Sequence, residues 1–342
     1  MTDIFIKSFN RPHYLDRCIF SIFKNVKGDF RITVLDDGTP EKYLQKLKEK
    51  YPNVIFKLSS QAEQKRKAIE ENLKNGTPIN GFLIPTDLWK NAVEKSEKYV
   101  LVTEDDVWFT KEINLDVIVQ EMEEKQIPLV KLGWLGMKND EQFCNVQKLS
   151  ENLTAITPKK LFTSGKTVMD WFMYNKYKFF TILYKLGMVD NHTKEKYWSI
   201  NSILMGLYDK NYWLAIWADA AGKVDEKQQL RNAAAWYHQN KKSVFARTHQ
   251  EVMKTTFQSS ATGSYHEYEN QFDVNFFNYI LNEAWLNGDF DALQNFPKDF
   301  SEDYIKDFLI EADSPNSRFE DWLIWAGKFK EQYRNLGAEI IG

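Results

Sequence analysis

Three consecutive acidic residues, Glu104, Asp105 and Asp106, follow directly on the apolar run at residues 99–102. Such a run is typical of a buried strand, so the three carboxylates stand at a strand end. Carboxylates crowded in this way repel one another unless a cation lies between them. Divalent ions such as Mg²⁺ take oxygen ligands, often one or two carboxylates completed by substrate phosphates and water. The cluster therefore predicts a site for a divalent cation and a phosphorylated ligand.

A second acidic pair, Asp36 and Asp37, lies in the segment FRITVLDDGTP at residues 30–40. Alternating apolar residues precede the pair as in a strand, and Gly-Thr-Pro follows it as a chain break. In open α/β sheets, ligands bind at the loops that follow the carboxyl ends of parallel strands. Both acidic clusters are expected in this position, so both are candidates for one shared site.

The elements that must position these residues alternate between strand and helix through the first hundred residues. This pattern, with its short connections, predicts a parallel sheet flanked by helices. The tail from about residue 270 instead shows helical spacing with many large aromatic residues, which predicts a helical extension. Strands are expected at 4–6, 30–36, 53–60, 99–102, 128–137 and 212–217, and helices from Pro12, around Leu44, across 61–76 and across 167–188, the last ending near Gly187.

Composition excludes several classes of protein. The hydrophobic fraction of 43% and the charged fraction of 27% are those of an ordinary soluble globular protein. A net charge of -3 gives no general attraction to nucleic acid. The two cysteines, Cys18 and Cys144, are too few for a zinc site or a disulfide framework. No run approaches the roughly 20 apolar residues of a transmembrane segment. We therefore expect a cytoplasmic protein, with a peripheral position at the inner membrane face as the alternative.

Three segments carry a family resemblance. IFIKSFNRPHYLDRCIFSIFKN, ITVLDDGTPE and KYVLVTEDDV follow one another within about residues 3–110. In this order they resemble the nucleotide-binding half of the family two glycosyltransferases, which have the GT-A fold. The resemblance implies an α/β fold with a Rossmann-like, mostly parallel central sheet and flanking helices. We expect a GT-A domain at 1–265, with its nucleotide-binding half at 1–110 and its acceptor half at 111–265, and a helical C-terminal extension at 266–342.

The resemblance also implies an activity. It predicts a metal-dependent transferase that moves a sugar, with inversion, from a UDP- or GDP-sugar to a hydroxyl of a glycan, lipid-linked or protein acceptor. Mn²⁺ or Mg²⁺ would be the cofactor, held by Asp106, with Asp105 toward the sugar and ribose. Asp37 would contact the nucleotide base. Arg11 would approach a phosphate or close a turn. The predicted nucleotide-binding residues are Ser8, Asn10, Arg11, Asp36, Asp37 and Asp105.

The catalytic base is harder to place. An inverting transferase needs a carboxylate near the acceptor hydroxyl. In family two this base often lies in an acidic pair at the start of a helix, before a late strand. No such pair occurs near Trp198, and the nearest carboxylates are Asp190 and Glu195, which become the candidates.

A late histidine brings a further metal ligand in several GT-A enzymes. His249 is the leading candidate because Arg247 and Lys254 lie close to it in sequence and could contact a diphosphate. His238 and His266 are alternatives.

Other functions are compatible with parts of the pattern. A nucleotidyltransferase could use the same fold, and a non-catalytic carbohydrate-binding protein could have the same aromatic content. A phosphohydrolase would be suggested by the segment DDGT, but its nucleophilic aspartate would have to stand at position 35, where the chain has Leu35.

Overall fold

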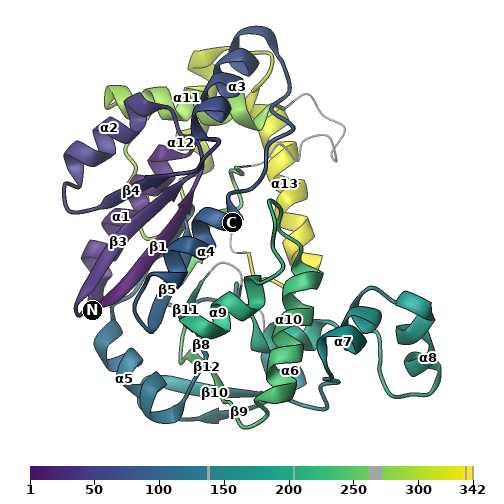
Figure 1. Cartoon of the computed structure of the whole chain (residues 1–342). Helices are drawn as coiled ribbons and strands as arrows, with labels where there is room; N and C mark the ends of the chain where they lie inside the picture. The colour runs from purple at the N-terminus through teal and green to yellow at the C-terminus, as the bar shows by residue number, and fades with distance from the viewer. Residues whose placement is uncertain (137–138, 203–204, 262–271, 336, 341–342) are drawn as a thin grey trace.

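The computed structural model describes residues 1–136, 139–202, 205–261, 272–335 and 337–340. A nine-stranded sheet has the order β4-β3-β1-β5-β11-β8-β12-β10-β9 (Figure 1). The pairings show that β11 and β10 are antiparallel to the other seven strands. The expected mostly parallel sheet is thus confirmed. Its strands are β1 Thr2–Ser8, β3 Phe30–Asp36, β4 Ile55–Leu58, β5 Tyr99–Glu104, β8 Leu129–Lys131, β9 Cys144–Lys148, β10 Leu153–Pro158, β11 Gly206–Asp209 and β12 Phe245–Thr248.

Shorter strands and helices complete the described structure. The short strands are β2 Val26–Lys27, β6 Val107–Phe109, β7 Ile113–Asn114 and β13 Met253–Thr255, and the 3₁₀ helices are η1 Lys176–Lys178 and η2 Glu195–Ile200. The α-helices are α1 Pro12–Asn25, α2 Glu41–Lys50, α3 Ala62–Asn75, α4 Thr86–Glu94, α5 Leu115–Lys125, α6 Asn139–Phe143, α7 Lys166–Met173, α8 Phe179–Lys185, α9 Lys210–Trp217, α10 Glu226–Gln239, α11 Val274–Asn287, α12 Glu302–Ala312 and α13 Phe319–Asn335.

The sheet separates two hydrophobic cores. Alternation along β1 sends Ile4 and Ile6 to one face and Phe5 to the other. The face of Ile4 is covered by α1 and α5, and its core continues into α11, α12 and α13. The face of Phe5 is covered by α4, α7, α9 and α10. Among the described helices, none has both the length and the apolar character to cross a membrane.

Two of the expected elements in the acceptor half were wrong. Residues 212–217 form helix α9, not a strand, and the side chain of Asp209 caps it by accepting from the N–H groups of Asn211 and Tyr212. A short apolar run does not by itself distinguish the two structures. The long helix across 167–188 is broken into α7 and α8 by Tyr177 and its neighbours, which have left-handed backbone conformations. This break folds α8 back, so that the Phe172 and Phe180 rings lie 5.2 Å apart.

Helix α11 and the segment that follows it pack against the first helix of the chain. His13 Nδ1 lies 2.8 Å from Asn282 Oδ1, and Trp285 Nε1 donates to Asp16 at 2.9 Å. Arg17 is buried and donates to the carbonyl oxygen of Ala292 at 3.1 Å. The predicted boundary between residues 265 and 266 lies outside the described part of the chain, so the division into two domains stays a prediction.

Candidate active site

A cavity of about 670 Å³, here called the strand-end cleft, opens at the carboxyl ends of β1, β3 and β5. Parallel neighbours end at the same edge of a sheet, which is why segments distant in sequence meet here. Among the residues predicted from the sequence, Ser8, Asn10, Arg11, Asp37 and Asp105 line this cleft together. Lys7, Lys65 and Glu104 line it as well, and residues 78–85 form one wall.

Basic side chains neutralise the carboxylates of the cleft. Lys7 Nζ lies 2.6 Å from Glu104 Oε1, and Lys65 forms an ion pair with Asp37. The Lys7 ammonium also lies over the rings of Trp89 and Trp217, at 4.9 and 5.5 Å from their centroids. These aromatic faces stabilise the cation in addition to its carboxylate partner. The cleft therefore has lysines held in fixed positions, where a phosphate could meet them.

Arg11 bridges Asp105 and Asp106, which together with Glu104 form the acidic group at the end of β5, here called the strand-end cluster. Its guanidinium donates to Asp105 Oδ1 at 2.5 Å and to Asp106 Oδ2 at 2.7 Å. Burial lowers the pKa of Arg11, but Asp105 and Asp106 outweigh burial and hold it above its usual value. Burial raises the pKa of Asp105 to about 7; Arg11 opposes this rise and Asp106 adds to it. One guanidinium thus pairs with two carboxylates, so Asp105 and Asp106 together carry more negative charge than Arg11 can neutralise.

Asp106 has one oxygen that this network does not use. Its Oδ1 atom is buried without a hydrogen-bond partner among the described residues, and Asp106 itself does not line the cleft. An uncompensated buried carboxylate oxygen is costly, so this atom is a candidate to bind a cation or a water molecule. Within the described ranges, no group of three or more His, Cys, Asp or Glu side chains is arranged around a common metal position. A cation here would need substrate oxygens or water as further ligands.

Asp36 and Asp37 have different surroundings. Asp36 is buried behind the cleft, and its Oδ1 accepts from the N–H groups of Gly38 and Thr39 at 3.0 and 2.9 Å. Gly38 has a positive φ, and a Cβ there would lie 2.8 Å from Lys65 Cβ, so the turn requires glycine. Asp36 thus shapes the turn that presents Asp37.

Asp37 faces the cleft. Its Oδ1 is buried without a hydrogen-bond partner among the described residues, although the Ser59 hydroxyl lies near enough to lower its pKa. Burial is the larger influence and raises the pKa of Asp37 overall. This oxygen could accept a hydrogen bond from a ligand N–H.

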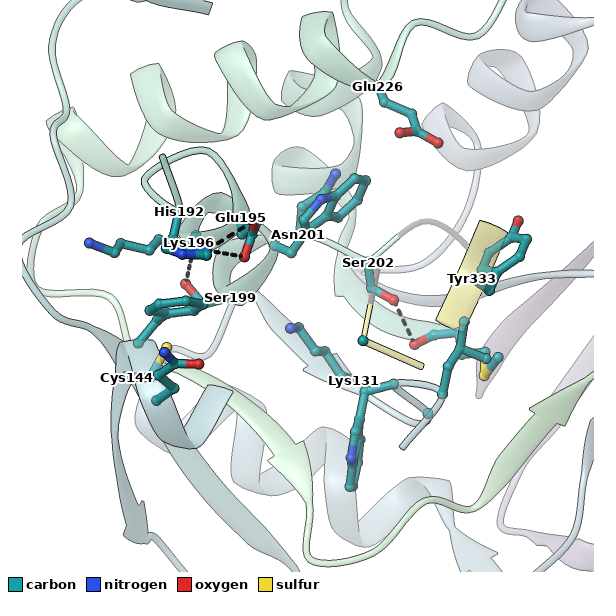
Figure 2. Close-up of a pocket in the computed structure, with 18 of the residues that line it drawn as sticks. Lys131, Cys144, His192, Glu195, Lys196, Ser199, Asn201, Ser202, Glu226 and Tyr333 are labelled. Atoms are coloured by element: carbon teal, nitrogen blue, oxygen red, sulfur yellow. Dashed lines mark hydrogen bonds and ion pairs between the residues drawn. The ribbon is translucent and has the colours of Figure 1, made fainter. Parts of the chain in front are cut away.

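A second cavity, of about 470 Å³, is here called the η2 pocket because residues of η2 form much of its wall (Figure 2). The end of β8 supplies Lys131 to it, and the end of α13 supplies Tyr333. In Figure 2, Glu226 and Tyr333 lie to one side of the view, and Lys196 lies to the other. The remaining lining includes Gly133, Trp134, Phe143, Cys144, His192, Glu195, Trp198, Ser199, Asn201, Ser202 and Met205.

The two predicted base candidates are placed differently. Glu195 lines the η2 pocket, and its Oε2 lies 3.3 Å from His192 Nδ1. Asp190 lines neither cavity. Its carboxylate accepts from the Thr193 hydroxyl at 2.8 Å and from Lys196 at 3.2 Å. The Thr193 hydrogen bond is the main cause that lowers the pKa of Asp190. Of the two, only Glu195 lines one of the two cavities.

The first turn of α10 contains a carboxylate that the sequence reasoning missed. Glu226 lines the η2 pocket, and burial, aided by Asp225, raises its pKa. Asp225 caps the helix by accepting from the Gln228 N–H at 3.1 Å. Val224, two residues before Glu226, lines the strand-end cleft. The signal was present in the sequence as the acidic pair in VDEK, which opens a helix.

Of the three histidine candidates, His249 contacts residues other than the acidic group at the end of β5. His249 Nδ1 lies 2.7 Å from Thr154 Oγ1, and its Nε2 lies 3.1 Å from Ser150 O. His249 lines neither cavity. A metal role for His249 stays a prediction that its position does not support. His238 is in the last turn of α10, and His266 lies outside the described residues.

Comparison with known proteins gives one family match. Residues 3–77, which span β1 to α3, match the family described as Glycosyl transferase family 2. This confirms the family resemblance inferred from the motifs of this part of the chain. A search of curated proteins finds no match.

Several solved glycosyltransferase structures show a weak similarity. Staphylococcus aureus TarS in complex with UDP-GlcNAc is 14% identical, with a TM-score of 0.43, over 96% of this chain and 80% of that chain. The bifunctional WbbM is 10% identical, with a TM-score of 0.37, over 97% and 51%. The galactosyltransferase LgtC, with donor and acceptor sugar analogues, is 14% identical, with a TM-score of 0.31, over 68% and 70%. At these TM-scores the similarities support no inference about this chain.

Proposed function

We propose that this chain, a glycosyltransferase whose residues 3–77 match family 2, moves a sugar from a nucleoside diphosphate in the strand-end cleft to an acceptor hydroxyl in the η2 pocket. The observation that carries this proposal is the start of α10, where Val224 lines one cavity and Glu226 lines the other. Two residues span at most about 7 Å of chain. The sugar end of a donor and the hydroxyl of an acceptor could therefore meet beside Glu226.

The strand-end cleft has the groups that a nucleoside diphosphate needs. The free Oδ1 of Asp37 can accept from a ring N–H of uracil or guanine, so a UDP- or GDP-sugar is the proposed donor. Lys7 and Arg11 line the same cleft, and each has N–H groups that could donate to the diphosphate beside its carboxylate partner. A cavity of about 670 Å³ is within the usual range for a ligand of this size.

A divalent cation, Mn²⁺ or Mg²⁺, fits the acidic cluster at the end of β5. Asp106 offers its buried, unpartnered Oδ1, and Asp105 and Glu104 line the cleft beside it. When bound, such an ion would neutralise the charge that develops on the diphosphate leaving group. Arg11 already binds Asp105 and Asp106, so it holds these carboxylates in position for that ion.

Glu226 is the proposed general base. Its carboxylate would accept the proton of the acceptor hydroxyl as that oxygen attacks the sugar, and an attack opposite the leaving diphosphate would invert the anomeric centre. A raised pKa suits a base that works near neutral pH. Glu195, the candidate from sequence, lines the same pocket and is the alternative. Trp134, Trp198 and Tyr333 also line it and offer aromatic faces to a sugar ring, which favours a glycan or a glycosylated acceptor.

The test is thermal stabilisation of the full chain by UDP and by GDP, each with and without MnCl₂. Ligand at about 100 times its dissociation constant should stabilise the fold by about 2.7 kcal/mol. We expect one of the two nucleotides to raise the melting temperature, and manganese to increase that rise. ATP serves as the control for non-specific binding of phosphate groups. Failure of both nucleoside diphosphates to stabilise the protein under either condition would contradict the proposal.

A further inference from the structure

Helices α7 and α8 form a projection from the body of the molecule, here called the arm and comprising residues 166–189 (Figure 1). One side of the arm is packed: Phe172 and Leu183 are buried in the core that covers the face of Phe5. The Phe172 ring contacts the Phe180 ring at 5.2 Å. This contact holds α8 against α7, and the buried side chains of Phe172 and Leu183 attach the arm to the body of the molecule.

The outer side of the arm exposes large apolar side chains. Leu186 is 67% exposed, Met188 62% and Ile182 50%. Ile182 and Leu186 are four residues apart at the end of α8, a spacing that places side chains on one face of a helix. Tyr184 is also exposed, and Tyr177 lies in the turn before α8. Single exposed apolar residues are ordinary, but a group of them marks an interaction surface.

The charge of the arm is mostly positive: Asp170 is its one acidic residue, against four lysines. Residues 171–189 contain Lys176, Lys178 and Lys185 and no aspartate or glutamate. Lys176 pairs with Asp170, whereas Lys178 and Lys185 have no ion pair within the part of the chain that the structure describes. Exposed apolar residues interleaved with lysines are typical of segments that lie in a membrane interface and attract anionic lipids.

We propose that the arm binds the surface of an anionic lipid bilayer, with Ile182, Leu186 and Met188 inserted and Lys178 and Lys185 at the head groups. Charge decides against a second copy of the chain as the occupant. A symmetric dimer would place the same surface against itself, and the lysines of the two copies would then repel one another. An anionic bilayer offers an apolar interior to the exposed side chains of the arm and negative head groups to its lysines.

Docking in this way has a consequence for the η2 pocket. The arm leads directly into the segment that lines this pocket, and Met188 is separated from His192 by at most about 14 Å of chain. A bound bilayer would thus hold the η2 pocket near the lipid surface, which suits a lipid-linked acceptor. This last step, and only this step, rests on the proposed function.

The experiment is vesicle flotation of the full chain. One set of vesicles is phosphatidylcholine alone, and the other is an equal mixture of phosphatidylcholine and phosphatidylglycerol. We expect binding to the anionic vesicles only. The double variants Leu186→Ser with Met188→Ser, and Lys178→Glu with Lys185→Glu, should each weaken that binding by about tenfold. Matched controls lie elsewhere on the surface: Ile310→Ser on α12, where the side chain is 59% exposed, and Lys67→Glu on α3, 70% exposed.

Melting temperature and nucleotide-dependent stabilisation report separately on the fold and on the strand-end cleft, and both should be unchanged in the arm variants. Absence of binding to anionic vesicles would overturn the proposal. Equal binding by the parent and both arm variants would also overturn it. So would a dimer that the apolar arm variant dissociates while vesicles have no effect. If vesicles bind through the arm but no nucleoside diphosphate stabilises the protein, the proposed function fails and the membrane surface stands.

Discussion

The strand-end cleft and the η2 pocket position their functional side chains in different ways. The cleft takes most of its charged residues from the ends of β1, β3 and β5, which are adjacent in one sheet. The η2 pocket takes residues from the end of β8 but also from α6, a 3₁₀ helix, the start of α10 and the end of α13. Pairing in a sheet fixes where a strand ends, whereas loops and helix ends are fixed only by tertiary packing. The difference explains why the first site could be predicted from sequence periodicity and the second could not.

The largest effect should come from the η2 pocket. Glu226→Gln removes the proposed base and keeps its shape, so we expect the transfer rate to fall by about a hundredfold to ten-thousandfold. Nucleotide affinity should stay unchanged, because the side chain lines the other cavity. The matched control is Glu195→Gln, which should have a much smaller effect. Steady-state transfer assays and nucleotide titrations would measure both. If Glu195→Gln proves the more damaging change, the roles of the two residues are reversed.

The next effect concerns the acidic cluster of the strand-end cleft. Asp106→Asn removes the charge of the carboxylate with the free oxygen, so manganese should no longer increase nucleotide affinity, a loss of about tenfold to a hundredfold. Binding without metal should persist. Asp105→Asn also removes an ion pair with Arg11 inside the cleft, so it should weaken binding with and without metal. Calorimetric titration with and without manganese distinguishes these outcomes. A manganese effect of equal size in Asp106→Asn and the parent would exclude Asp106 as a ligand.

Asp37→Ala should have a smaller effect. Loss of one charged hydrogen bond of about 1.5 kcal/mol should weaken binding of the preferred nucleoside diphosphate by about tenfold. Manganese binding should be nearly unchanged, since the residue lies on a different strand end from the acidic cluster. Asp29→Ala, at an exposed position, is the control. Simultaneous loss of nucleotide and manganese binding would show instead that the pair between Asp37 and Lys65 is structural.

The smallest effect is a shift in the pH dependence of kcat/KM. A protonated carboxyl group cannot accept a proton, so kcat/KM should rise with pH as Glu226 ionises. Because burial raises the pKa of Glu226, the midpoint of this rise should lie above the ordinary value of 4.5. The profile of Glu226→Gln should lack this limb. A parent profile whose acidic midpoint is at or below 4.5 would argue against Glu226 as the base.

Five of the predicted nucleotide-binding residues line one cavity, because each lies at or just after the end of a strand that the sequence pattern predicts. Glu226 was not predicted, because one earlier element was assigned wrongly. Residues 212–217 were expected to be a strand, so the acidic pair before a late strand was sought near Trp198. Under the proposed function, the late strand would be β12, and the acidic pair would open α10, the helix that precedes it. A helix and a buried strand share the same apolar run here, and only packing distinguishes them.

The metal candidates show a second limit. Asp105 and Asp106 are neighbours in sequence, yet only Asp105 lines the cleft. His249 was chosen for its basic neighbours, but its ring nitrogens contact Thr154 and Ser150. The direction of a side chain at a strand end depends on its partners, which here include Arg11. The spacing of apolar residues in the sequence does not predict such partners.

The contact between Arg17 and the carbonyl oxygens of Ala292 and Gln294 has a consequence for how the protein is made. Arg17 leaves the ribosome long before its acceptors are synthesised, and a buried guanidinium without partners is strongly destabilising. The first helix therefore cannot reach its final packing during most of translation. We expect a nascent chain stalled at residue 273 to be digested by protease and to bind chaperones, and one stalled with residue 342 fully emerged to resist both. Resistance at the earlier length would show that the N-terminal sheet folds vectorially, without its last helices.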